Sequence, residues 1–173
     1  YPSIGMVLCL HKDIDFKAAC FQAYNRWLAE FCAKDPRRLI GVGQAAVKTI
    51  DEGIRELESI KALGLKGVML PGEPHVEDYD HPCYDPFWQA TIDLHLPVSF
   101  HILTSRADDL GTGNKGRGPK INAFMQIIRG NQDIMGMLCF GAVFERNPKL
   151  QVICVEADAG WVPHFTYRMD HAY

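Results

Sequence analysis

The stretch LPVSFH at residues 96–101 is a short apolar segment that ends in a histidine. A segment of helical periodicity beginning at Asp85 precedes it, and a glycine-rich polar segment, residues 104–119, follows it. A helix, a buried strand, a metal-ligand type of side chain and a long loop together make half of a βαβ unit. In parallel barrels, the reacting groups gather at the carboxyl ends of such strands. His101 is therefore the first candidate for a functional residue.

The same alternation runs along the whole chain. Apolar runs of strand length alternate with helical segments, and the runs are residues 4–10, 39–46, 68–70, 96–101 and 150–155. Strands that read as continuous apolar runs are buried on both faces and belong to parallel sheets. The pattern predicts an α/β fold, either an open doubly wound sheet or most of an eight-stranded barrel. No Gly-x-Gly-x-x-Gly motif follows a strand, which argues against a dinucleotide fold.

Four of the helices can be placed by their caps, apolar spacing and breaks. Asp13 is the expected cap of a helix with one buried stripe, made of Phe16, Ala19, Cys20, Ala23, Trp27 and Phe31. The capping box TIDE at residues 49–52 begins another. Pro119 suits the first turn of a further helix, and a separate one is expected from Asp133 to about Arg146, before the Asn147-Pro148 break.

Composition limits the function classes. With 173 residues, 47% of them hydrophobic, the chain can form one ordinary core, and a net charge of −3 gives no support for nucleic-acid binding. Six scattered cysteines without a C-x-x-C pair indicate reduced thiols and a cytoplasmic protein. The longest nearly unbroken apolar run, residues 135–144, is too short to span a bilayer. We therefore expect a small-molecule substrate, neither nucleic acid nor membrane as a partner, and a homo-oligomer.

Polar side chains stand where several predicted strands end. They are His11, Gln44, Glu73 with His75, His101, and Glu156 with Asp158. Histidine and carboxylate ligands converging on one barrel mouth suit a divalent ion of the zinc type. His101 ends an otherwise apolar strand, where burial without a partner would be costly, so a ligand role is favoured over a core histidine. Glu156 emerges from the core in the same way, whereas Asp158 also fits the first turn of a helix.

The loop after His101 offers cations. Arg106, Lys115 and Arg117 could hold a substrate carboxylate, and a solvated loop is an equally good reading of the same residues.

Several motifs together resemble one family. They are YNRWL (24–28), DPRRL (35–39), YDPFW (84–88) before LPVSFH, FERNPKL (144–150) and GWVP (160–163). The chain resembles the amidohydrolase-related proteins that are relatives of aminocarboxymuconate-semialdehyde decarboxylase, over nearly its whole length. The resemblance implies a (β/α)8 TIM-type barrel with a divalent metal, usually zinc, at the strand ends.

The resemblance also implies which part of the barrel is present. Residues 4–10 fall near the second strand, His101 matches the metal ligand of the fifth, and residues 150–155 match the sixth. We thus expect residues 1–173 to be a single partial barrel domain covering roughly strands two to six, without the first strand and the last two, and inactive as a fragment. No His-x-His pair of the first-strand type occurs, and Glu156 stands where the decarboxylases have a sixth-strand histidine.

The resulting expectation is a metal-dependent hydrolase or decarboxylase (carboxy-lyase) for a carboxylated small molecule. His101 would hold the divalent metal, which is expected to be zinc, while Glu156 and Asp158 are the candidate catalytic carboxylates. Arg106, Arg117 and His164 are the candidate substrate-binding residues. Two alternatives stay open: a catalytically impaired homologue that binds small molecules, and an open α/β domain in which His101, Glu156 and Asp158 do not cluster.

Overall fold

The structure, a computed structural model, describes residues 3–104 and 123–173. Its centre is a parallel sheet of order β1-β2-β3-β4, formed by β1 (Gly43–Gln44), β2 (Val68–Met69), β3 (Val98–His101) and β4 (Val152–Val155). Helices connect each strand to the next, which is the repeat that the apolar runs predict. The predicted parallel α/β fold is confirmed.

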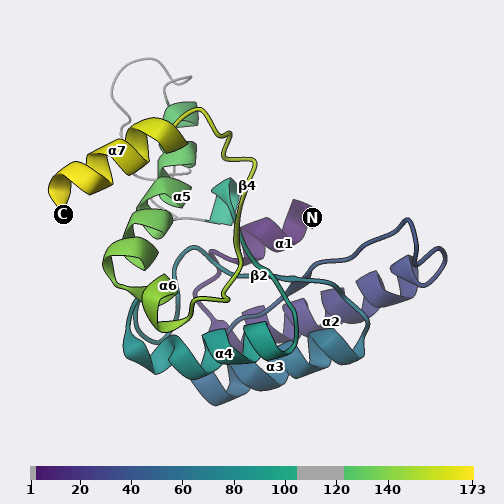
Figure 1. Cartoon of the computed structure of the whole chain (residues 1–173). Coiled ribbons are helices and arrows are strands. Elements are labelled where there is room, and N and C mark those ends of the chain that lie inside the picture. Colours follow the sequence, from purple (N-terminus) through teal and green to yellow (C-terminus); the bar gives the residue numbers. More distant parts are fainter. Residues whose placement is uncertain (1–2, 105–122) are drawn as a thin grey trace.

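One face of the sheet packs against two helices, α3 (Ile50–Ala62) and α4 (Asp85–Asp93), which lie side by side (Figure 1). The side chains of Val98 and Phe100 lie on this face of the sheet, within a core of buried side chains. Prominent members of that core are Leu57, Ile60, Tyr79, Tyr84, Phe87 and Trp88. Thr49 caps α3 by accepting the N–H of Glu52, as the capping box predicts.

The opposite face, which we call the inner face, carries the side chains that alternate with those of the core. Cross-strand partners share a face, so the register places Gln44, Met69, Ser99 and Ile153 in one row across it. His101 lies on the same face, two residues beyond Ser99 along β3. The inner face is therefore the one that presents the candidate histidine.

Residues 4–10 form a helix rather than the predicted strand. The structure has α1 (Ser3–Leu8), followed by a turn in which the N–H of Cys9 bonds to the carbonyl of Gly5. A short apolar run does not by itself distinguish a strand from a buried helical segment. Here it packs Cys9 with Met69 and Phe21 on the inner face. The described residues thus contain four strands, not five.

Helix α2 (Ile14–Cys32) has the predicted cap but a different buried side. Asp13 accepts the N–H groups of Asp15 and Phe16. The buried residues are Lys17, Phe21 and Asn25, while much of the predicted aromatic stripe is exposed: Phe16 by 50% and Trp27 by 55%. The stripe prediction is wrong, and its reason lies in the bonds of Asn25, described below.

The helices near the C-terminus also break at a different place. One helix, α5 (Ala123–Phe140), continues through Asp133, and the break falls at Gly141 and Ala142, before α6 (Val143–Arg146). Ala142 has a left-handed φ of 56°. Arg146 holds this corner, since it binds the Asp85 carboxylate and donates to the carbonyls of Asp80 and Gly141.

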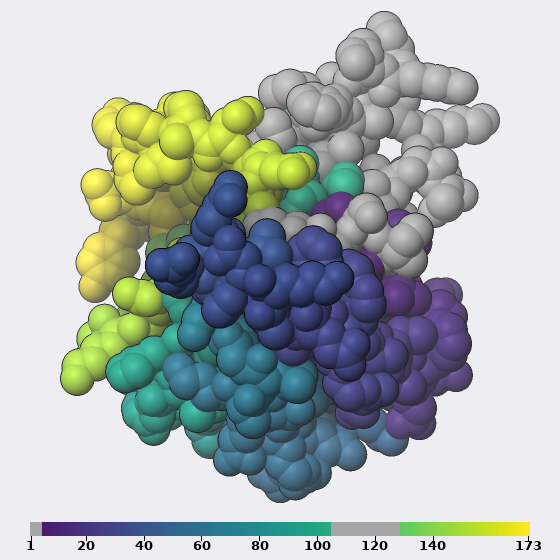
Figure 2. Space-filling view, turned by 90° about the vertical axis from the view of Figure 1, so that its right-hand side faces the viewer, coloured from purple at the N-terminus to yellow at the C-terminus, as the bar shows by residue number. Residues whose placement is uncertain are grey.

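The remaining elements are α7 (Val162–Ala172) and two single turns of 3-10 helix, η1 (Pro82–Tyr84) and η2 (Ile102–Thr104). Figure 2 shows the N-terminal segment (purple) and the C-terminal segment (yellow) on opposite sides of one face of the molecule. Among the described residues, no helix is both long enough and apolar enough to cross a membrane.

Candidate active site at the ends of β3 and β4

His101 and Glu156 meet at the carboxyl ends of two neighbouring strands. His101 pairs with Val155 in the sheet register, so the next residue after β4, Glu156, begins beside it. The imidazole Nε2 lies 3.3 Å from the Glu156 Oε2. The two side chains differ in exposure: His101 is 1% exposed and Glu156 is 65% exposed. A buried imidazole thus contacts a carboxylate that reaches solvent.

Backbone groups orient the imidazole. The N–H of Leu103 donates to the His101 Nδ1 at 3.1 Å. Because Nδ1 accepts this N–H, the nitrogen that faces the Glu156 carboxylate is Nε2, at 3.3 Å. η2 supplies this N–H, and it is fixed in turn because the Thr104 hydroxyl donates to the His101 carbonyl at 2.9 Å.

Glu156 sits in a strained turn. Its φ is 59° and that of Asp158 is 54°, and both are left-handed values that side chains other than glycine rarely adopt. Ala157 between them is buried, and its carbonyl accepts the indole N–H of Trp161 at 2.6 Å. Trp161 therefore holds the turn that points Glu156 at His101.

The other predicted site residues lie elsewhere or outside the described chain. Asp158 is exposed, and no hydrogen bond or ion pair joins it to His101 within the described residues. His164 is exposed on α7. Arg106 and Arg117 lie outside the described residues. Their proposed roles, and that of Asp158 in catalysis, remain predictions.

Few potential metal ligands lie together in the described part of the chain. In residues 3–104 and 123–173, no group of three or more histidine, cysteine, aspartate or glutamate side chains is arranged to hold a metal ion. His101 and Glu156 offer the right donor types for two positions around a divalent ion. Coordination through the His101 Nε2 would require that nitrogen to carry no proton.

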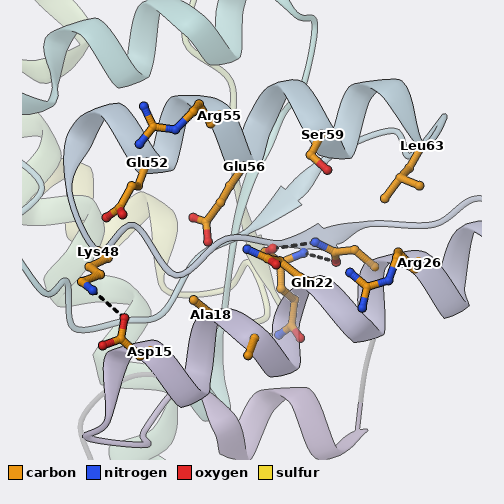
Figure 3. A pocket seen from close by; sticks show the side chains of 13 residues that line it. Asp15, Ala18, Gln22, Arg26, Lys48, Glu52, Arg55, Glu56, Ser59 and Leu63 are labelled. Carbon is orange, nitrogen blue, oxygen red and sulfur yellow. Dashed lines mark hydrogen bonds and ion pairs between the residues drawn. The ribbon is translucent and has the colours of Figure 1, made fainter.

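A polar groove lies apart from this pair, between α2 and α3 (Figure 3). Its volume is about 560 Å³, and its lining does not include His101 or Glu156. Lys48 and Asp15 form an ion pair across it, and Glu56 points to its floor. The Glu56 carboxylate accepts the N–H groups of Ala46 and Val47 at 3.0 and 2.9 Å. Burial raises the pKa of Glu56, and the two N–H donors oppose that rise. Asp15, Lys48 and Glu56 of this groove are thus already paired with other groups of the fold.

One buried charged residue of α2 does not stand out in the apolar pattern of the sequence. Lys17 is only 7% exposed, on the side of α2 that faces Cys9. Its spacing of four from Phe21 and eight from Asn25 places it on the buried side, and a lysine in an i, i+4, i+8 row with a buried aromatic is the signal that could have identified it.

Comparisons with known proteins identify the family of this chain. A family model described as Amidohydrolase matches residues 12–172. The chain is 24% identical over 155 residues to a 2-amino-3-carboxymuconate-6-semialdehyde decarboxylase of Dictyostelium discoideum, covering 88% of this chain and 41% of that protein. It is 27% identical over 156 residues to a gamma-resorcylate decarboxylase of a Rhizobium species, covering 85% of this chain and 46% of the relative. The chain thus spans less than half the length of these relatives.

A solved structure shares the fold. A 5-carboxyvanillate decarboxylase of Novosphingobium aromaticivorans, crystallised with manganese and 3-methoxy-4-hydroxy-5-nitrobenzoic acid, superposes with a TM-score of 0.77 at 22% identity. The match covers 99% of this chain and 48% of that one. The described sheet is therefore the corresponding part of a barrel, as predicted.

Proposed function

Because this chain belongs to the amidohydrolase family, we propose that the full-length protein is a metal-dependent enzyme that releases the carboxyl group of a small-molecule acid as CO2. The observation that carries the proposal is the buried His101 in contact with Glu156 at the ends of two parallel strands. Decarboxylation is favoured over hydrolysis because both curated relatives described above are decarboxylases.

The roles follow from the chemistry of the groups. Decarboxylation breaks a C–C bond, leaves the electron pair on carbon and requires a proton in place of the lost CO2. A bound divalent ion would supply a Lewis acid that orients and polarises the substrate. His101 is the proposed ligand in the described chain. Zinc is the ion that the family resemblance implies, while the neighbour above was crystallised with manganese.

Glu156 is the proposed proton carrier. Its carboxylate is largely exposed and can therefore take up and release protons to solvent, and its Oε2 lies 3.3 Å from the His101 Nε2. Asp158 is proposed as a second carboxylate of the same turn, and Arg106, Arg117 and His164 as groups that bind the substrate.

Metal analysis tests the proposal. The full-length protein should carry stoichiometric zinc or manganese, and His101→Ala should lose it. His171→Ala, which removes an exposed histidine of α7, is the matched control and should keep it. Glu156→Gln should keep the metal and lose about 100-fold or more in CO2 release from hydroxybenzoic acids.

A second function rests on the protein partners of His101. Its Nδ1 accepts the Leu103 N–H and its Nε2 contacts the Glu156 carboxylate, so both ring nitrogens have protein partners. This arrangement therefore favours a homologue that binds carboxylated molecules without turning them over. A full-length protein that contains no metal, releases no CO2 and still binds hydroxybenzoates would establish this function and overturn the first.

A further inference from the structure

One side of α2 carries an apolar stripe that the fold leaves open to solvent. We call it the α2 stripe, and its members are Phe16, Cys20, Ala23, Trp27 and Phe31. Its three aromatic side chains are each exposed by 44% or more. Steps of three and four residues keep the stripe on one side of the helix. Trp27 comes two residues after Asn25, which bonds to β1, and so lies about 200° around the helix axis from it. The α2 stripe therefore faces away from the sheet.

The exposed rings form one continuous surface. The Trp27 and Phe31 rings stack with their centroids 5.7 Å apart at an interplanar angle of 23°, and the Tyr24 ring lies 5.7 Å from that of Trp27. The Lys34 ammonium lies 6.0 Å from the centroid of the Phe31 ring. A contiguous exposed patch of this kind is typical of a surface that binds another molecule. Tryptophan and tyrosine are also the side chains that most often dominate the binding energy of protein interfaces.

Charges flank the α2 stripe at both ends. Lys12 and Asp13 directly precede the helix, and Lys34 and Asp35 follow its C-cap. Two copies of α2 laid antiparallel bring the start of one helix beside the end of the other. Each lysine then meets an aspartate, since Lys12 faces Asp35 and Lys34 faces Asp13. A parallel pair would instead set each charge against itself, which is unfavourable. The flanking charges thus fit a second copy of this chain in the antiparallel orientation.

The residues of the α2 stripe have the same symmetry. The register that pairs the flanking charges places a two-fold axis just after Ala23. Phe16 of one copy then lies opposite Phe31 of the other, and Cys20 lies opposite Trp27. The large indole therefore faces a small side chain, and the alanine beside the axis allows the two helices to approach closely.

We propose that the full-length protein forms a homodimer with two-fold symmetry, in which the α2 stripes of the two subunits pack antiparallel on one another. Such an interface is isologous, so every contact occurs twice. Trp27 carries the largest share of its binding energy, because a tryptophan enclosed by an interface is a typical hot spot. The dimer does not rest on the proposed function, since the α2 stripe faces away from the sheet that carries His101.

Sedimentation velocity of the full-length protein over a range of concentrations tests the dimer. Wild type should change from monomer to dimer as the concentration rises. Trp27→Ala should weaken this association by about tenfold or more. Tyr167→Ala is the matched control, because it removes an exposed aromatic ring of α7 and should leave the association unchanged.

Charge reversal tests the antiparallel register. Lys12→Glu or Asp35→Lys alone sets like charges against one another at both ends of the interface, and each should weaken the dimer several-fold. The double variant restores opposite charges and should regain the wild-type association. A structural role of either residue would not produce this rescue.

A cysteine beside the axis gives an independent test of the register. Ala23→Cys brings two thiols together across the two-fold axis, so mild oxidation should link the subunits by a disulfide more than it does in wild type. Ala33→Cys, at an exposed position far from the axis, should remain at the wild-type level.

A full-length protein that stays monomeric at every concentration overturns the proposal, because another part of its own chain or solvent then covers the α2 stripe. A dimer as strong in Trp27→Ala as in wild type also overturns it, as does a double charge variant that associates no better than the single ones. Metal content and CO2 release are separate measurements, so failure of the dimer leaves the proposed function standing, and the reverse also holds.

Discussion

Glu156 adopts a backbone conformation that its residue type disfavours. A left-handed φ costs a side chain with a Cβ roughly 1–2 kcal/mol, and here both Glu156 and Asp158 adopt it. Such strain persists where the surroundings impose it, and Trp161 and the buried Ala157 do so at this turn. The turn places the carboxylate against His101, so the strain and the candidate chemistry coincide.

Replacing Glu156 with asparagine should therefore stabilise the protein and remove its function. Asparagine tolerates the left-handed region, so Glu156→Asn should raise the free energy of unfolding by about 0.5–1 kcal/mol. Urea denaturation measures the gain. Glu156→Gln is the matched control, since it also loses the charge but keeps the strain. Equal stability of the two variants would show that the strain is not a cost in this fold.

At the scale of elements, one hydrogen-bonding side chain decides how α2 faces the sheet. Asn25 donates to the carbonyl of Gln44 and accepts its N–H, both at 2.8 Å, and so replaces a neighbouring strand at the edge of β1. The apolar pattern of the sequence predicts that Trp27 faces the core, and it gives no sign of this pairing. An amide that satisfies two backbone groups at a sheet edge outweighs the burial of one aromatic side chain, and sequence periodicity carries no signal for it.

Removal of that amide should destabilise the fold strongly. Asn25→Leu leaves the N–H and carbonyl of Gln44 without partners, at about 1–3 kcal/mol for each buried group. We expect a loss of about 2–4 kcal/mol in urea denaturation. Arg26→Leu, at the exposed neighbouring position, should change stability by less than about 0.5 kcal/mol. A loss of the same size in both variants would contradict the role given to Asn25.

The corner between α5 and α6 gives a second test at this scale. A Cβ at Gly141 would collide with the Cβ of Asp80 and would lie 2.8 Å from the Met137 carbonyl. Gly141→Ala should therefore cost about 1–3 kcal/mol of unfolding free energy, measured by thermal denaturation. Gly160→Ala is the control, because an added Cβ there meets nothing within 4 Å. Equal melting temperatures would show that the corner yields to the extra atom.

At the scale of the whole molecule, the sequence predicts the architecture better than the details. The apolar runs of β2 to β4 and the cap of α3 are read correctly, because a strand buried on both faces has a plain apolar signature. Residues 4–10 have the same signature yet form α1, since burial alone does not select the backbone. Polar residues at strand ends stand out, so the sequence indicates His101 and Glu156 as candidates. It does not indicate the burial of Lys17, because a lysine within a helix is expected to be solvated.

Buried thiol and phenol groups make the stability of the fold depend on pH in the alkaline range. Burial raises the pKa of Cys9 to about 12 from its ordinary 9.0, and it also raises those of Tyr79 and Tyr84. In the unfolded chain these groups ionise at their ordinary values, whereas in the folded protein they keep their protons. Their contribution is thus fully present below pH 9 and is lost as the pH rises toward 12. Lys17, whose pKa is lowered by burial, opposes this trend.

Cys9→Ala should therefore flatten the alkaline limb of the stability curve. One group that stays protonated only in the folded state contributes about 1.4 kcal/mol per pH unit between its two pKa values. Urea denaturation at pH values of about 8, 9, 10 and 11 measures the unfolding free energy across this range. Its decrease with pH should be smaller in Cys9→Ala than in the wild type, and unchanged in Cys20→Ala. Parallel curves for wild type and Cys9→Ala would mean that folding does not raise the pKa of the Cys9 thiol.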